Sequence, residues 1–272
     1  MRKSVADGKF YPEDESELRE KVGKYLVSKR ENIKIAFCPH AGYAYSGKLA
    51  GKIISMIPDK KDIIILGVNH SGLGNKISFS KEDFSTPLGV VKNNNELGHR
   101  IFEKLKHADL DVDVNEEAHN VEHSIEVQLP FLQVSQKKEM KIVPILLKDL
   151  KYEECEKVAE VLKEFLRESE FILISGDMTH YGPLYNFVPE GIEGKDLDNY
   201  DKLILLEALK KDSKGFYHKA EKSTICGIYG SVIGVKIAEL LNLDVELVDY
   251  YTSGDITKDY ENVVGYGGVV MK

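Results

Sequence analysis

The sequence predicts one α/β domain over residues 1–272, with a mainly parallel or mixed central sheet flanked by helices. Short, nearly continuous apolar runs alternate along the chain with amphipathic stretches of helical periodicity. This alternation is typical of a largely parallel sheet between two helical layers. The length suits a single α/β unit, and the chain shows no internal repeat and no convincing linker.

Six apolar runs predict the strands of this sheet. Most of their residues are apolar on both alternating faces, which indicates strands covered by helices on both sides. In chain order the predicted strands are Ile33–Cys38, Ile63–Val68, Lys141–Leu147, Phe171–Ser175, Val245–Tyr251 and Val263–Met271.

Five stretches with apolar residues every three or four positions predict helices. The predicted helices are Glu15–Ser28, Glu96–Lys106, Tyr152–Arg167, Asn199–Lys210 and Ser231–Leu241. The proline and glycine residues of Gly182–Gly194 predict a long surface loop rather than a domain boundary.

Charge and composition exclude several classes of protein. The net charge of −8 argues against nucleic acid as the main partner, because binding to phosphates calls for a basic face. No apolar run is long enough for a transmembrane helix, and Met1–Phe10 does not resemble a signal peptide. The three cysteines are too few and too scattered for a disulfide framework. We therefore expect a cytoplasmic protein without a membrane partner.

Reactive side chains follow three of the predicted strands. His40 lies two residues after the first strand, and His70 lies two residues after the second. Asp177 and His180 follow the fourth strand. A single histidine after a strand is more often a hydrogen-bonded loop residue. Three such loops favour a common site, because the carboxyl ends of parallel strands meet at the ligand crevice of an α/β sheet.

Cys226 is the cysteine most consistent with a site. It lies just ahead of a predicted helix, whose N-terminus should lower the thiol pKa and favour the metal-binding thiolate. The alternative is a small buried apolar residue. Cys155 lies on an apolar helical stripe and is predicted to belong to the core. Cys38, within a strand, is also predicted to be core, with a supporting role beside His40 as the alternative.

The segment Glu122–Pro130 supplies a further candidate. If it is helical, His123 and Glu126 share a face and can act as a ligand or proton donor with its orienting carboxylate. A solvent-exposed polar face is the alternative. The remaining histidines lie in charged surroundings and are predicted to be on the surface. They are His99, His107, His119 and His218.

Five motifs, in order along the chain, resemble the Memo family in its prokaryotic branch. The most distinctive is Pro39-His40-Ala41-Gly42-Tyr43-Ala44-Tyr45-Ser46-Gly47. The others are Gly8-Lys9-Phe10-Tyr11-Pro12, Glu122-His123-Ser124-Ile125-Glu126, Ser175-Gly176-Asp177 with His180, and Thr224-Ile225-Cys226-Gly227. The resemblance extends from about residue 2 to the C-terminus.

The resemblance implies a fold shared with the LigB-type class III extradiol dioxygenases, which are non-haem iron enzymes. It implies that His40, His70 and Cys226 are metal ligands. It also implies that Asp177, His180 and His123 line the same pocket, with His180 similar to the acid–base histidine of the dioxygenases. Those enzymes use a carboxylate where this chain has Cys226, which puts ring cleavage in doubt and leaves metal binding intact.

Three functions follow from these expectations. The first is a metal-dependent oxidoreductase that uses iron or copper, with His180 moving protons and Asp177 orienting either His180 or a bound water. The second is a zinc hydrolase with the same donors. The third is an adaptor that binds a peptide or small molecule in this pocket without catalysis. The resemblance also implies a radical SAM protein as a partner. A phosphopeptide role is expected to be secondary, because only five arginines are present.

Overall fold

A computed structural model describes residues 1–59, 62–136, 139–166 and 171–272. Its strands are β1 Ile35–Cys38, β2 Asp62–Val68, β3 Ile77–Phe79, β4 Phe84–Thr86, β5 Gly89–Asn93, β6 Val112–Val114, β7 Lys141–Leu147, β8 Ile172–Ser175, β9 His180–Tyr181, β10 Val245–Thr252 and β11 Val263–Met271. Its α-helices are α1 Glu15–Tyr25, α2 Gly47–Met56, α3 Asn95–His107, α4 Glu116–Val121, α5 Leu129–Ser135, α6 Tyr152–Phe165, α7 Leu197–Leu209, α8 Ser213–Ala220, α9 Ile228–Leu241 and α10 Ser253–Thr257. Short 3₁₀ turns cover Glu126–Gln128, Pro183–Tyr185 and Gly194–Asp196.

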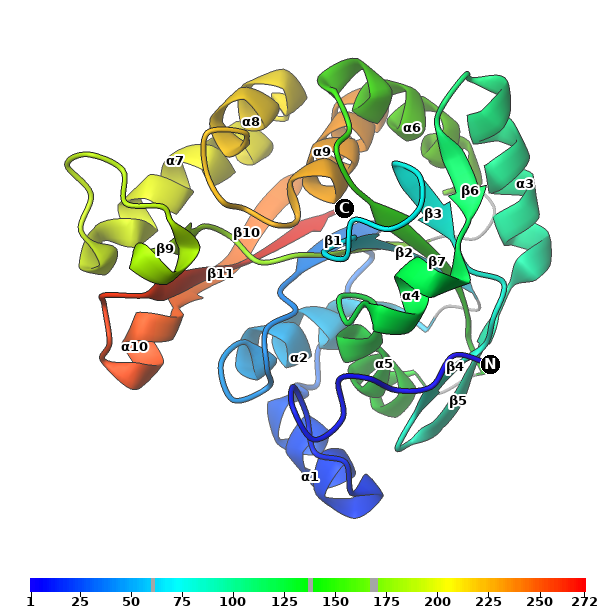
Figure 1. Cartoon of the computed structure of the whole chain (residues 1–272), viewed down its shortest axis with the longest axis horizontal. Helices are drawn as coiled ribbons and strands as arrows, with labels where there is room; N and C mark the ends of the chain where they lie inside the picture. The colour runs from blue at the N-terminus through cyan, green and yellow to red at the C-terminus, as the bar shows by residue number, and fades with distance from the viewer. Residues whose placement is uncertain (60–61, 137–138, 167–170) are drawn as a thin grey trace.

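One mixed sheet runs through these residues, as Figure 1 shows. The strand order along its main path is β10-β11-β1-β8-β2-β7-β3-β6. The four central strands β1, β8, β2 and β7 are parallel, and β11 joins β1 in the antiparallel direction. The carboxyl ends of β1, β8 and β2 therefore lie side by side at one edge of the sheet.

Helices cover both faces of the sheet (Figure 1). On β1, Ile35 and Phe37 belong to the core formed with α3, α6, α7, α8 and α9. Ala36 and Cys38 belong to the opposite core, formed with α1, α2 and α5. Alternation of side chains along a strand explains why all four residues of β1 are buried. The prediction that Cys38 and Cys155 lie in the core is confirmed.

The structure confirms the predicted α/β fold class and all six predicted strands, within one or two residues at their ends. The sequence did not predict β3, β4, β5, β6 or β9, which have two to five residues each. It also missed α2, α4, α5, α8 and α10. The predicted helix Glu15–Ser28 ends early, at Tyr25. The predicted end at Arg167 lies outside the described residues. Gly182–Gly194 is a loop with short 3₁₀ turns, as expected.

Among the described residues, no helix is both long and apolar enough to cross a membrane.

Candidate metal centre

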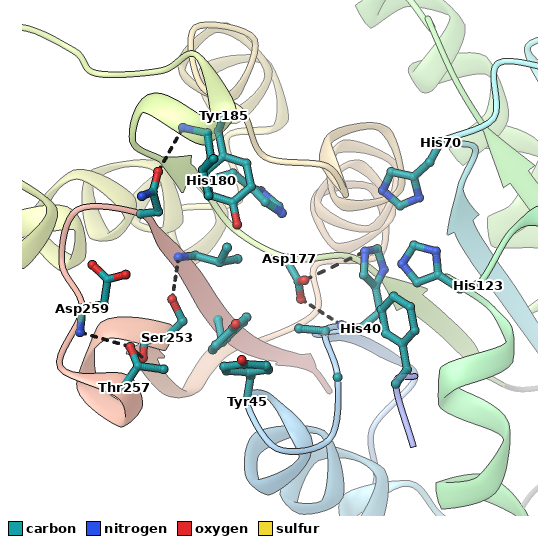
Figure 2. A pocket seen from close by; sticks show the side chains of 17 residues that line it. His40, Tyr45, His70, His123, Asp177, His180, Tyr185, Ser253, Thr257 and Asp259 are labelled. Carbon is teal, nitrogen blue, oxygen red and sulfur yellow. Dashed lines mark hydrogen bonds and ion pairs between the residues drawn. The ribbon is translucent and has the colours of Figure 1, made fainter. Parts of the chain in front are cut away.

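The loops after β1, β2 and β8 bring their polar side chains to one place. Figure 2 shows the His40, His70 and His123 rings facing one another, with Asp177 beside His40. The centroid of the His40 ring lies 5.4 Å from that of His70 and 5.3 Å from that of His123. The parallel arrangement of β1, β8 and β2 causes this convergence, because it places the ends of all three strands on the same edge.

Cys226 reaches this cluster from the start of α9. Its Sγ atom lies 3.3 Å from Nε2 of His40. One donor atom each from His40, His70 and Cys226 lies within 4.8 Å of the other two. The approach depends on two glycines, since a Cβ atom on Gly176 would lie only 2.4 Å from the Cα atom of Gly227. The backbone after β8 and the N-terminus of α9 can touch only because both positions lack side chains.

His40 is held through its other ring nitrogen. Its Nδ1 lies 3.2 Å from Oγ of Ser175, and that hydroxyl donates its hydrogen to the carbonyl oxygen of Ser124. The Ser175 oxygen must therefore accept from Nδ1–H of His40, which leaves the lone pair of Nε2 pointing toward Cys226. Burial, together with the nearby His123 and His70, holds the pKa of His40 well below its usual value. The ring is therefore neutral, as a metal ligand must be.

Glu122 orients the other two imidazoles. Its buried carboxylate lies 3.0 Å from Nδ1 of His70 and 3.2 Å from Nδ1 of His123. It also accepts backbone N–H bonds from His70, His123 and Ser124. Burial opposes ionisation of this group, but the bonds from His123 and His70 outweigh it and hold the pKa of Glu122 far below its usual value. With both Nδ1 atoms bound to one carboxylate, both Nε2 atoms are left for the pocket.

The Cys226 thiol does not have the lowered pKa expected from its place before a helix. Burial raises the pKa of this thiol well above its usual value, and the negative charge of Asp177 adds to the effect. The backbone N–H of Asp177 donates to the sulfur over 3.1 Å, which lowers the pKa but does not compensate for the loss of water. Without a bound metal, burial therefore outweighs the lowering of the thiol pKa that the helix N-terminus was expected to cause. A metal cation would reverse the balance, because it binds the thiolate.

Asp177 and His180 line the same cavity as His40 and His70. The Oδ1 atom of Asp177 accepts the backbone N–H of His40 over 2.8 Å, and burial raises the pKa of this carboxyl. Nδ1 of His180 donates to the carbonyl oxygen of Thr224 over 3.1 Å, which leaves Nε2 as a proton acceptor. The Thr224 hydroxyl in turn donates to the carbonyl oxygen of His180. These bonds tie the backbone at His180 to Thr224, two residues before Cys226.

A cavity of about 530 Å³ opens in front of these groups. His40, His70, His123, Asp177 and His180 are among its lining residues. Aromatic side chains supply much of its wall, and Ser253, Thr257 and Asp259 lie at the end opposite His70 in Figure 2. The aromatic lining residues are Phe10, Tyr45, Tyr185 and Tyr266. A volume of this size accommodates a small organic molecule.

The donor set fits a single metal ion. Nε2 of His40 and Sγ of Cys226 have the separation expected of two ligands about 2.0–2.3 Å from one ion. The other ring nitrogen of each candidate imidazole already has an oxygen partner, Ser175 for His40 and Glu122 for His70. Such partners fix the ring orientation in metal sites.

Comparison with known proteins gives the same family as the sequence motifs. Residues 2–270 match the family model described as Memo-like protein. The chain belongs to the Memo-like family. It is 36% identical to a MEMO1 family protein of Aquifex aeolicus, covering 100% of this chain and 99% of the relative. It is 34% identical to a MEMO1 family protein of Pyrococcus furiosus, again over 100% of this chain and 99% of the relative.

The fold resembles that of a solved structure with little sequence similarity. An uncharacterized protein of Escherichia coli K12 aligns with a TM-score of 0.58 at 13% identity. The alignment covers 88% of this chain and 100% of that one. At this identity the likeness concerns the fold alone.

Sequence reasoning about this Memo-like chain missed Glu122 and misplaced two other residues. Glu126 does not face His123, because residues 122–125 are not helical, and its carboxylate binds Arg2 instead. Glu122, adjacent to His123, is the orienting group. His119 was expected on the surface and is 1% exposed, with Nε2 donating to the carbonyl oxygen of Ser78 over 2.9 Å. Glu122 belongs to the same motif as His123 and is its neighbour in the chain. The helical spacing of three residues between His123 and Glu126 favoured Glu126 instead.

His99, His107 and His218 are exposed, as predicted.

Proposed function

We propose that this Memo-like protein holds one iron or copper ion between His40, His70 and Cys226 and functions as a redox enzyme. The observation that carries the proposal is the convergence of these three donors from separate segments. In each histidine Nδ1 is bound to an oxygen partner, which leaves Nε2 available to a metal. A purely structural cluster would not require both imidazoles to present free lone pairs to the same point.

The donor types favour iron or copper. Two imidazoles and one thiolate suit these metals, and zinc also binds such a set. A bound iron or copper ion would supply a redox centre with a free coordination position for a small molecule. Retaining a thiolate in place of a carboxylate makes the donor set softer than that of the extradiol dioxygenases, so a reaction other than ring cleavage is expected.

The protein groups around the donors are suited to moving protons. Nε2 of His180 is a free acceptor because Nδ1 is committed to Thr224. Asp177 has a raised pKa through burial, so it holds its proton more readily than an exposed aspartate. His123 presents a second free Nε2 through its bond to Glu122. We assign His180 as the general base, with Asp177 and His123 orienting the substrate or exchanging protons with it.

The competing proposal is an adaptor that uses the same cavity to bind a peptide or small molecule. The aromatic wall formed by Phe10, Tyr45 and Tyr185 favours binding of a planar or apolar group. Among the described residues, no lysine or arginine lines this cavity. Capture of a phosphorylated ligand would therefore depend on the metal rather than on a basic side chain.

Metal titration tests the proposal. Replacing Cys226→Ser should weaken binding of iron, copper or cobalt by more than about tenfold, since serine lacks a thiolate. Cys155→Ser is the matched control, because Cys155 lies in the core on α6, and it should bind as the wild type does. His180→Ala should also retain metal binding. Calorimetry under anaerobic conditions, with the metal content and redox state of protein purified without added metal, measures these outcomes.

If Cys226→Ser and the wild type bind iron, copper and zinc equally well, the proposed ligand set is wrong. His123 or Asp177 would then be the third ligand.

A further inference from the structure

The segment Arg2–Tyr11 packs against the candidate metal centre through a buried ion pair. Arg2 is 0% exposed, and its guanidinium donates to the carboxylate of Glu126. The same guanidinium donates from Nε to the carbonyl oxygen of His119 over 2.9 Å and from a terminal nitrogen to the carbonyl oxygen of Glu122. Arg2 thereby holds both ends of the turn that presents the Glu122 carboxylate.

Glu126 also binds the rest of the segment Arg2–Tyr11. Its carboxylate accepts the backbone N–H groups of Val5 and Ala6, each over 3.0 Å at the shorter contact, and the hydroxyl of Tyr11. A buried ion pair is tolerated when its remaining polar atoms are also hydrogen-bonded, and that is the case here. The segment is therefore fixed in one conformation relative to the turn that carries Glu122.

Phe10 belongs to this fixed segment and lines the cavity. Its ring stacks on His123 at a centroid distance of 4.3 Å and an interplanar angle of 29°. His123 stacks in turn on His70, at 5.0 Å and 16°. The carbonyl oxygen of Phe10 accepts the N–H of Tyr43, in the loop that carries His40. Phe10 thus contacts both the His123 ring and the loop that carries His40.

We propose that Arg2 and Phe10 are positioning residues of the centre. Arg2 fixes the turn that carries Glu122, and Phe10 holds the His123 ring flat against His70. Together they set the directions in which both Nε2 atoms point. The effect on metal affinity rests on the proposed metal site, whereas the effect on the rings does not require a metal.

The phenylalanine ring can be tested with conservative variants. Phe10→Leu keeps an apolar side chain but removes the stacking surface, and Phe10→Tyr restores it. The matched control is Phe102→Leu, because Phe102 on α3 also contacts one aromatic ring, Phe79, away from the cavity. An effect that merely reflects loss of a packed ring would appear equally in Phe10→Leu and Phe102→Leu.

The first measurement uses the metal-free protein. Long-range ¹H–¹⁵N spectra distinguish imidazole tautomers, and we expect the Nδ1–H form for both His70 and His123 in the wild type. In Phe10→Leu the His123 signals should move toward a mixture of tautomers, and Phe10→Tyr should restore the wild-type signals. Phe102→Leu should leave both rings unchanged.

The second measurement is Co²⁺ affinity by competition with a chelator. Phe10→Leu should weaken Co²⁺ binding by about tenfold, the lower range for groups that orient ligands. Phe10→Tyr and Phe102→Leu should stay within about twofold of the wild type, since neither changes what orients the ligands. Arg2→Lys keeps the charge beside Glu126 but cannot reach both carbonyl oxygens, so it should shift the signals of His70 and His123 together.

The two measurements separate the two proposals. If Phe10→Leu leaves the His123 signals and the Co²⁺ affinity at wild-type values, the positioning role is wrong, whether or not Arg2→Lys folds. If the wild type binds no Co²⁺ but its ring signals respond to Phe10→Leu as expected, the metal site fails and the positioning of the rings stands.

Discussion

Hydrogen bonds on the far side of each imidazole determine what the centre presents to a ligand. Ser175 takes Nδ1–H of His40, and Glu122 takes Nδ1–H of both His70 and His123. A ring fixed in this way has one defined tautomer and one free lone pair. The identity of these partners depends on residues 50 or more positions away in the chain for His40 and His70, so spacing along the sequence could not reveal them.

Burial of His119 predicts a pH-dependent stability. Burial lowers its pKa to about 4, from 6.5 in an exposed ring. Between these values the unfolded chain binds a proton that the folded ring does not, so stability is full above pH 6.5 and falls as the pH is lowered toward 4. The loss attributable to His119 should be about 2–3 kcal/mol between pH 7 and pH 4.5. Urea unfolding of the wild type and His119→Gln at both pH values measures it.

The change in the free energy of unfolding between the two pH values is compared in the wild type and His119→Gln. This comparison isolates His119, because the buried His40 ring is present in both proteins and contributes in the same direction. His99→Gln is the control, since His99 is exposed on α3 and should leave the wild-type pH dependence unchanged. Parallel pH profiles for the wild type and His119→Gln would show that His119 is not the source.

At the scale of elements, the contact between the end of β8 and the start of α9 decides whether Cys226 reaches His40. Gly176 follows β8 directly and Gly227 precedes α9, and their backbones approach closely. Phe37 on β1 fills the space beside both glycines. A methyl group on either residue would force the helix away from the strand.

Gly176→Ala should therefore destabilise the protein and weaken metal binding together. Overpacking of this kind costs about 1–3 kcal/mol. Displacement of α9 would also separate the sulfur of Cys226 from Nε2 of His40. Urea unfolding and Co²⁺ titration of the same variant measure the two effects.

Gly23→Ala provides the matched control for that substitution. Gly23 lies exposed within α1, and a Cβ atom there would meet nothing within 4 Å. The change should raise stability by up to about 1 kcal/mol and leave Co²⁺ affinity unchanged. A Gly176→Ala protein that binds Co²⁺ as tightly as the wild type would contradict the importance of the close approach.

At the scale of the whole molecule, the donor atoms join segments that are distant in the sequence. His40 and Cys226 are 186 residues apart, and His70 comes from a third segment. A ligand bound by all three stabilises only the folded chain, because the unfolded chain does not bring them together.

Metal loading should therefore raise the thermal unfolding temperature. At a free metal concentration about 100 times the dissociation constant, the gain is about 2.7 kcal/mol. For a chain of this size that corresponds to a rise of about 5–10 °C. Scanning calorimetry of chelator-treated and metal-loaded protein measures it, and Cys226→Ser should show a much smaller rise. Equal rises in both proteins would place the stabilising metal elsewhere.

The sequence by itself determined the fold class, the six principal strands and the family. Strands such as Lys141–Leu147 and Val263–Met271 could be located because burial on both faces leaves an uninterrupted apolar run. The positions of His40, His70 and Asp177 followed from the same logic, since each lies two residues after a strand. The short strands β3, β4, β6 and β9 could not be found, because two or three residues carry too little periodicity.

Only the tertiary structure decided how these side chains are connected. It replaced Glu126 with Glu122 as the carboxylate that orients His123, because the turn there is not a helix. It buried His119, and it raised the pKa of Cys226 where the helix alone predicted a lower one. These outcomes depend on desolvation and on hydrogen bonds between distant segments. Local sequence does not encode either quantity, because both arise only when the chain has folded.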